Sequence, residues 1–206
     1  MHLGKRIMLF ICGLILFSMG IAQAVQVKYL GIHPWEVLHV GLYEMFGLSI
    51  GQWSIIIGVI LIIITLLLDR QYIHIGTFLN VFFVGWSVDL ILWLDFLPHA
   101  HHLIIDMMLI ILSMALMGVG GGINNAARIG SGPRDGFMLA IADKTNFSIR
   151  SIRITLESSI VILGILIGGP VFIFTFIYTF VQSPLFQFAY LKGRQFLMAK
   201  KEVLEL

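Results

Sequence analysis

The chain has 206 residues, of which 59% are apolar and 12% charged, and its formal net charge is +2. A water-soluble domain has about 45–50% apolar and about 25% charged residues. This chain therefore has too little polar surface to cover a soluble fold, and the bilayer is its expected solvent. The small net charge argues against a nucleic-acid partner. The single cysteine, Cys12, excludes a disulfide framework or a cysteine-rich metal site. The composition predicts an all-α integral membrane protein with one membrane domain over residues 1–206.

The first apolar run, residues 7–27, follows Lys5 and Arg6 and ends near Ala22-Gln23-Ala24, which resembles the end of a cleavable signal peptide. A second long apolar run, residues 103–123, holds the equivalent place in the second half of the chain. We therefore expect residues 7–27 to be retained as a membrane span.

Two polar motifs interrupt the apolar runs, GIHPWEVLHVGL from Gly31 and GSGPRDGFMLAIADKTNFSI from Gly130. A shift of 99 positions aligns them in the pairs Gly31/Gly130, Pro34/Pro133, Glu36/Asp135, Glu44/Asp143, Ser49/Ser148 and Ile50/Ile149. Glycine, proline and acid in the same order and spacing are hard to obtain by chance. We infer an internal duplication, with repeats over about 1–95 and 103–191.

Each repeat contains three long apolar runs and one short interrupted segment. The long runs are 7–27, 51–68, 75–94, 103–123, 152–168 and 171–190. The short segments, 34–47 and 133–145, would reach only ~20 Å as helices, whereas the hydrocarbon core is ~30 Å thick. We expect six transmembrane helices and two short, broken or re-entrant segments.

The basic residues favour this topology. With six spans and a cytoplasmic N-terminus, 12 of the 13 Lys and Arg residues lie on the cytoplasmic side and only Lys28 lies outside. If both short segments crossed, the division would become 9 and 4. Residues 192–206 then form a cytoplasmic tail, so both termini of this cell-membrane protein are cytoplasmic. Because three spans per half is an odd number, the two repeats must be inverted relative to each other.

The residues around each proline predict how the short helices begin. Gly31, Gly130 and Gly132 permit sharp turns. Pro34 and Pro133 suit the first position of a helix, where a missing N–H costs nothing.

The acids that follow the prolines, Glu36 and Asp135, fall in the first helical turn, near its positive end. They have two open interpretations. They cap short interfacial helices, or they line a central site that binds a cationic group or carries protons. In the second case His39 shares a helix face with Glu36, and Arg134 is a partner for an acid or an anion.

Other polar residues inside apolar runs also have two uses each. Asp89 is an ion or proton carrier, or a buried hydrogen-bonded packing residue. Glu157 is a carrier, or it pairs with Arg153 one turn away. Asn80 and Asn124 bind solute, or they join helices by hydrogen bonds, which is the commoner use of asparagine in membranes.

The loop PHAHH contains His99, His101 and His102. It has no recognised zinc-ligand spacing. We expect no metal and no cofactor.

GIHPWEVLHVGL, IGTFLNVFFVGWSVD and GSGPRDGFMLAIADKTNFSIRSIRITLE resemble the YitT/YczE/YyaS family of bacterial membrane proteins over nearly the whole chain. The most specific part is Gly130 to Gly136. The first motif departs from the family pattern, because Glu36 stands where an aspartate is usual. It also departs from the second motif, because His33 stands where that copy has Gly132. The resemblance implies a polytopic inner-membrane protein and supplies no substrate.

Inverted repeats with broken helices favour a transporter or permease for a small polar solute, with the acids of the short helices at a central site. The alternative is a membrane binding or accessory subunit, substrate-capturing or regulatory, that acts with a partner protein. The expected partners are the lipid bilayer, a small polar solute, and a partner subunit or further copies of the chain in a homo-oligomer. We do not expect an enzyme, because the sequence offers no Ser–His or Cys–His pairing and no paired metal-ligand motif.

Overall fold

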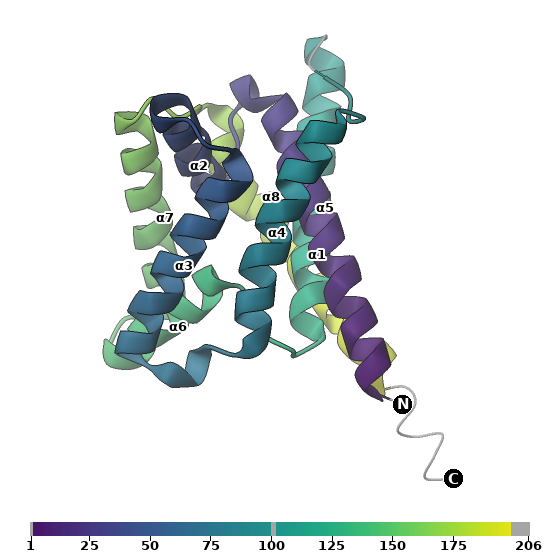
Figure 1. Cartoon of the computed structure of the whole chain (residues 1–206), viewed down its shortest axis with the longest axis vertical. Helices are drawn as coiled ribbons and strands as arrows, with labels where there is room; N and C mark the ends of the chain where they lie inside the picture. The colour runs from purple at the N-terminus through teal and green to yellow at the C-terminus, as the bar shows by residue number, and fades with distance from the viewer. Residues whose placement is uncertain (1, 100–101, 199–206) are drawn as a thin grey trace.

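The computed structural model describes residues 2–99 and 102–198 (Figure 1). Over these residues its regular elements are eight α-helices and two short 3₁₀ helices. The long helices are α1 (His2–Gln26), α3 (Ile50–Leu68), α4 (Ile75–Leu94), α5 (Leu103–Ala126), α7 (Ile149–Leu166) and α8 (Ile173–Met198). The short helices are α2 (Pro34–Phe46), α6 (Pro133–Lys144), η1 (Lys28–Leu30) and η2 (Arg70–Tyr72).

Helices α2 and α6 lie where the two proline motifs predict them. Pro34 and Pro133 occupy the first helical position of α2 and α6. Gly31 has a φ of +93°, which favours glycine. Gly130 needs to be glycine for another reason, because a Cβ atom there would lie 2.5 Å from the carbonyl carbon of Gly76. The second glycine thus permits close packing against α4, and of the two glycines only Gly31 has a positive φ.

The repeated Ser-Ile pair also has a structural role. Ser49 caps α3, where its hydroxyl accepts from the Gln52 amide and its own amide donates to the Gln52 side chain. Ser148 caps α7 by accepting from the Ser151 amide at 3.1 Å. Such caps satisfy backbone donors that a helix start leaves unpaired.

Four helices, α1, α3, α4 and α5, are long and apolar enough to cross a membrane. Helix α7 carries Arg150, Arg153 and Glu157 within its 18 residues. It and α8 match two predicted spans in position but are not among the four. The structure is therefore that of an all-helical, multi-pass membrane protein, and the six-span arrangement stays a prediction.

The helices form two packed groups (Figure 1). Helices α1, α4, α5 and α8 form the first, and α1 and α5 pack most closely at small residues. A Cβ atom on Gly13 would lie 2.5 Å from the Asn124 amide, and one on Gly20 would lie 2.8 Å from the Met117 amide. These contacts show that α1 and α5 are antiparallel. Arg6 extends from the start of α1 to donate a 2.7 Å hydrogen bond to the Ala127 carbonyl, just beyond the end of α5.

Helices α2, α3, α6 and α7 form the second group, in which α2 packs on α7 and α3 packs on α6. The groups are joined mainly where α3 meets α4. There a Cβ atom on Gly51 would lie only 2.0 Å from the Gly85 carbonyl oxygen. Over the described residues α7 makes no comparable contact with α8. The two groups are thus in contact on the side of α3 and α4 and separated on the side of α7 and α8.

The far end of each short helix is tied to a nearby loop. Glu44 of α2 pairs with Lys28, and Asp143 of α6 accepts hydrogen bonds from Tyr72 and Gln71. Glu44 and Asp143 are aligned by the repeat, so the tethers use equivalent acids with different partners.

Candidate functional site

The N-terminal ends of α2 and α6 meet inside the protein, where the first-turn acid of α2 is completely enclosed. Glu36 has no exposed surface. Its Oε1 accepts a 2.9 Å hydrogen bond from Nη2 of Arg134, and its Oε2 lies 2.8 Å from Nδ1 of His33. This approach lacks hydrogen-bond geometry, so Oε2 of Glu36 has no hydrogen-bond donor among the described residues. The same Nδ1 accepts a 3.4 Å hydrogen bond from the Trp35 amide and so caps the start of α2.

Arg134 belongs to α6 but completes a site on α2. Its guanidinium carbon lies 5.0 Å from the ring centroid of Trp35, which adds a cation–π contact to the ion pair. Trp35 and Arg134 are also equivalent under the 99-residue shift. The two motifs therefore meet at aligned positions that carry different side chains.

Two residues that the sequence analysis did not select support His33. Tyr178 of α8 packs edge-on against the imidazole, with ring centroids 5.7 Å apart. Its hydroxyl lies 2.6 Å from that of Ser113, and both residues are fully buried. The only sequence pattern that could have pointed to Tyr178 is its position as a tyrosine inside an apolar run.

The acid of α6 is more accessible. Asp135 has a side chain that is 35% exposed, and its Oδ1 lies 3.6 Å from Nη2 of Arg153. The two acids that the repeat aligns therefore differ in environment, one buried and neutralised and the other partly open.

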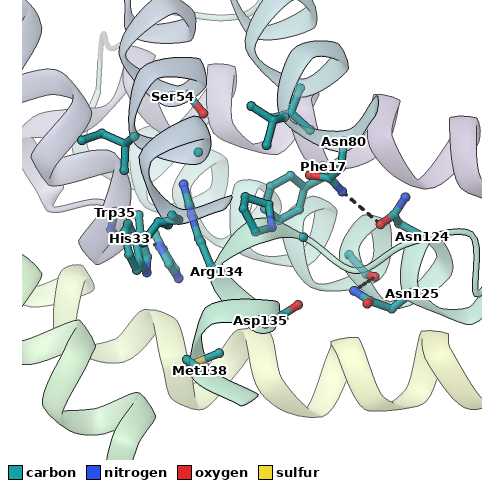
Figure 2. Close-up of a pocket in the computed structure, with 18 of the residues that line it drawn as sticks. Phe17, His33, Trp35, Ser54, Asn80, Asn124, Asn125, Arg134, Asp135 and Met138 are labelled. Atoms are coloured by element: carbon teal, nitrogen blue, oxygen red, sulfur yellow. Dashed lines mark hydrogen bonds between the residues drawn. The ribbon is translucent and has the colours of Figure 1, made fainter. Parts of the chain in front are cut away.

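A cavity of about 190 Å³ lies at this junction (Figure 2). Its polar lining residues are His33, His39, Ser54, Asn80, Asn124, Asn125, Arg134, Asp135, Arg153, Glu157, Gln182 and Ser183. Phe17, Trp35, Met138 and Phe186 supply much of its apolar wall. All eight α-helices contribute to the cavity, so it is a central site.

Three asparagines form one side of the cavity (Figure 2). Asn80 donates to Oδ1 of Asn124 at 3.2 Å, and Asn124 donates to the Phe10 carbonyl at 3.3 Å. Asn125 donates to the Gly121 carbonyl at 3.1 Å. These amides join α4, α5 and α1, and they also face the cavity, so both uses expected of Asn80 and Asn124 are compatible with the structure.

The predicted site residues separate into two sets. His39, Asn80, Asn124, Arg134, Asp135 and Glu157 line the cavity, whereas Glu36 and Asp89 do not. Asp89 instead accepts from the Gly51 amide at 2.8 Å and from the Ser49 hydroxyl, which stabilises the start of α3. These hydrogen bonds are compatible with the packing interpretation of Asp89, whose side chain is only partly buried. Arg153 forms an ion pair with Asp135. The expected pairing of Arg153 with Glu157 stays a prediction.

His39 is notable because it is only 1% exposed and its Nε2 has no hydrogen-bond partner within the described part of the chain. In the PHAHH loop, His99 lies 3.0 Å from Asp95, and His101 falls outside the described residues.

The sequence analysis missed Ser54, Gln182 and Ser183, which are polar residues of long apolar helices. Gln182 and Ser183 precede Pro184 inside α8. A polar pair beside a proline in an apolar run was a usable signal.

The long apolar helices define a multi-pass, all-helical membrane protein. The chain belongs to DUF6198, a family of unknown function, whose sequence profile matches residues 4–190. It is similar to the uncharacterized membrane protein YczE of Bacillus subtilis (strain 168), with 34% identity over 79% of this chain and 74% of that protein.

Two further relatives extend this similarity. The uncharacterized protein YyaS of the same organism is 28% identical over 77% of this chain and 79% of its own length. An uncharacterized protein of Haemophilus influenzae (strain ATCC 51907 / DSM 11121 / KW20 / Rd) is 30% identical over 69% of this chain and 64% of its own. No solved structure gives a significant match. The resemblance to YczE and YyaS is thereby confirmed.

Proposed function

We propose that this protein is a membrane transporter or permease for a small polar solute. One observation carries the proposal: the cavity at the junction of α2 and α6 is lined by ionisable and amide side chains from both halves of the chain. Polar and ionisable groups at membrane depth are expensive and are retained mainly along solute or ion pathways. Discontinuous helices that meet at such a site are typical of secondary transporters.

We further propose that six spans form two inverted repeats, with α2 and α6 as re-entrant segments. Packing under the 99-residue shift supports this. Gly31 packs against Thr175 at the start of α8, and Gly130 packs against Gly76 at the start of α4. Gly76 and Thr175 are themselves aligned by the shift. In the same way the pair α2 and α7 corresponds to the pair α6 and α3.

The proposed orientation places both termini in the cytoplasm. Arg6 bonds to the carbonyls of Ala127 and Arg128, so these basic residues share one end of the bundle. Lys5 lies 4.7 Å from the ring centroid of Phe196, which brings the end of α8 to the same place. Positive charge gathered at one end favours the cytoplasmic side.

The route of access follows the separation between α7 and α8. A second hollow of about 270 Å³ shares Asp135, Arg153 and Phe186 with the cavity and continues past Ile149 to Tyr190. Ile149 begins α7, and Tyr190 lies in the last third of α8. We propose that this is the cytoplasmic entrance, and that closing α7 on α8 while α3 parts from α4 would open the opposite side.

This movement differs from the rocking of one repeat against the other that inverted repeats lead us to expect. Each packed group contains helices of both repeats, and α1 of the first repeat packs mainly on α5 of the second. The repeats are interleaved and cannot separate as rigid bodies. The two packed groups are the units that would move.

The test is uptake of radiolabelled polar solutes by proteoliposomes that contain the purified chain. Asp135→Asn should reduce uptake by about tenfold or more, because it removes the charge of the exposed acid. Asp89→Asn is the matched control and should preserve uptake, because the amide oxygen can still accept from the Gly51 amide outside the cavity. Equal uptake by wild type and Asp135→Asn would contradict the proposal. Absence of flux together with co-purification of an ATPase would favour the accessory-subunit alternative.

A further inference from the structure

Glycine at the start of α6 leaves a small space between two acceptor oxygens. A Cβ atom on Gly132 would lie 3.9 Å from Oδ1 of Asn80 and 4.0 Å from Oδ2 of Asp135, with no other described atom within 4 Å. The Asn80 amide is oriented by its donation to Asn124, and Oδ1 of Asp135 faces Arg153. Both oxygens that border the space are hydrogen-bond acceptors, and the Asp135 carboxylate also interacts with the Asn125 side chain.

The other polar wall offers donors. Arg134 uses Nη2 on Glu36, but a guanidinium has five N–H groups, and the Arg134 side chain is 20% exposed and lines the cavity. His39 lines the same cavity, and its buried Nε2 has no partner among the residues described. A buried polar atom without a partner is costly and requires an explanation. A carboxylate bound between Arg134 and His39 would provide that partner.

The charge balance favours a ligand with little net charge. The acids at the site are Glu36, Asp135 and Glu157, and the basic residues are Arg134 and Arg153. These side chains sum to −1 with neutral histidines. The N-terminal ends of α2 and α6 add about +0.5 each, because helix dipoles place partial positive charge there. The site is thus close to neutral overall, with acceptors on one wall and donors on the other.

We infer that the cavity binds a zwitterionic solute of amino-acid size, with its ammonium between Asp135 and Asn80 and its carboxylate on Arg134 and His39. The cavity volume of about 190 Å³ corresponds to about six water molecules, which fits a small zwitterion. This inference rests on the proposed function in taking the cavity as a solute site. It assigns the ammonium to the acid of α6 and leaves Glu36 as the counter-ion of Arg134.

Binding to the purified chain in nanodiscs tests the inference without transport. The probes are L-alanine, L-serine, L-proline and γ-aminobutyrate, each compared with its amide and its N-acetyl derivative. Equilibrium dialysis should detect binding of at least one zwitterion, and both derivatives of that compound should bind about tenfold or more weakly, because each lacks one charged group. If no zwitterion binds, or if a derivative binds equally well, the inference is wrong.

Gly132→Ala provides the sharpest variant. Its φ of −60° and ordinary contact distances allow alanine without strain, so the thermal midpoint of the ligand-free protein should be nearly unchanged. The methyl group would occupy the ammonium position and should weaken zwitterion binding by about tenfold or more. Gly4→Ala, where the added methyl meets no described atom within 4 Å, is the matched control and should bind normally. Normal binding by Gly132→Ala would overturn the placement.

The two proposals fail separately. Zwitterion binding without flux in proteoliposomes would remove the transporter function and keep the site. Flux of an uncharged or singly charged solute, without zwitterion binding, would keep the transporter and refute the inferred ligand class.

Discussion

Glu36→Gln should destabilise the folded protein by about 3 kcal/mol. The Glu36 carboxylate has no exposed surface and lies 2.9 Å from the Arg134 guanidinium. Removing one partner of a buried ion pair costs about 3–5 kcal/mol, because the other charge is left in the interior uncompensated. We expect the lower end of this range, since the Arg134 side chain is 20% exposed to the cavity and keeps some solvation.

Asp135→Asn is the matched comparison, because it changes the equivalent acid of the second repeat. Its pair with Arg153 has a longer distance of 3.6 Å, and both side chains are more than one-third exposed. Such a pair contributes about 0–1 kcal/mol. The two substitutions should therefore differ in their effect on the free energy of unfolding, although the sequence presents the acids as equivalents.

Unfolding by SDS in mixed micelles measures these free energies. The double variant Glu36→Gln/Arg134→Gln should lose less stability than the sum of the single variants, because it removes both charges together. Additive losses, or a Glu36→Gln variant as stable as wild type, would show that the pair does not hold α2 against α6.

Three further predictions follow from the packing and the loops. Gly13→Ala should lower the free energy of unfolding by about 1–3 kcal/mol or more, because its methyl would overlap α5. Gly4→Ala, the control, should leave it unchanged, and equal thermal midpoints for the two variants would contradict the prediction. Asp89→Ala should lower the free energy of unfolding by about 2 kcal/mol, because the start of α3 loses its hydrogen bonds to Asp89. Ligand binding in dialysis should be unchanged, and a loss of binding would instead favour the ion- or proton-carrier interpretation of Asp89. The hydrogen bond to Asp143 raises the pKa of the Tyr72 phenol above 10.0, so its stabilising effect is complete below pH 10 and is lost as pH rises through the raised pKa. The difference in thermal midpoint between wild type and Tyr72→Phe should therefore shrink above pH 10, and a constant difference would refute the assignment.

Local chemistry made much of the fold predictable. The bounds of α2 and α6 were predicted within two residues, because a proline at the first helical position and a preceding glycine are local signals. The caps at Ser49 and Ser148 act within three residues of chain, so they too are readable from the sequence. The class of protein follows from composition alone.

The site was predicted only in part. Asn80 and Asp135 stood out because polar residues inside apolar runs are rare, and both line the cavity. Glu36 and Asp89 carried the same signal and do not line it. The pattern identifies a polar side chain whose burial is unfavourable. It does not say whether a ligand or another residue offsets the free energy of that burial.

The sequence by itself determined that this chain is a helical membrane protein with two short helices and a few polar residues in its apolar runs, and it predicts an internal duplication. Apolar run length, proline position and repeat spacing are properties of neighbouring residues, so they need no knowledge of distant contacts. The tertiary structure alone decided that Arg134 neutralises Glu36 across 98 residues of chain, and that Asp135 stays partly open. Whether a buried charge is paired or available depends on which distant side chain packing brings to it, and no local pattern encodes that contact.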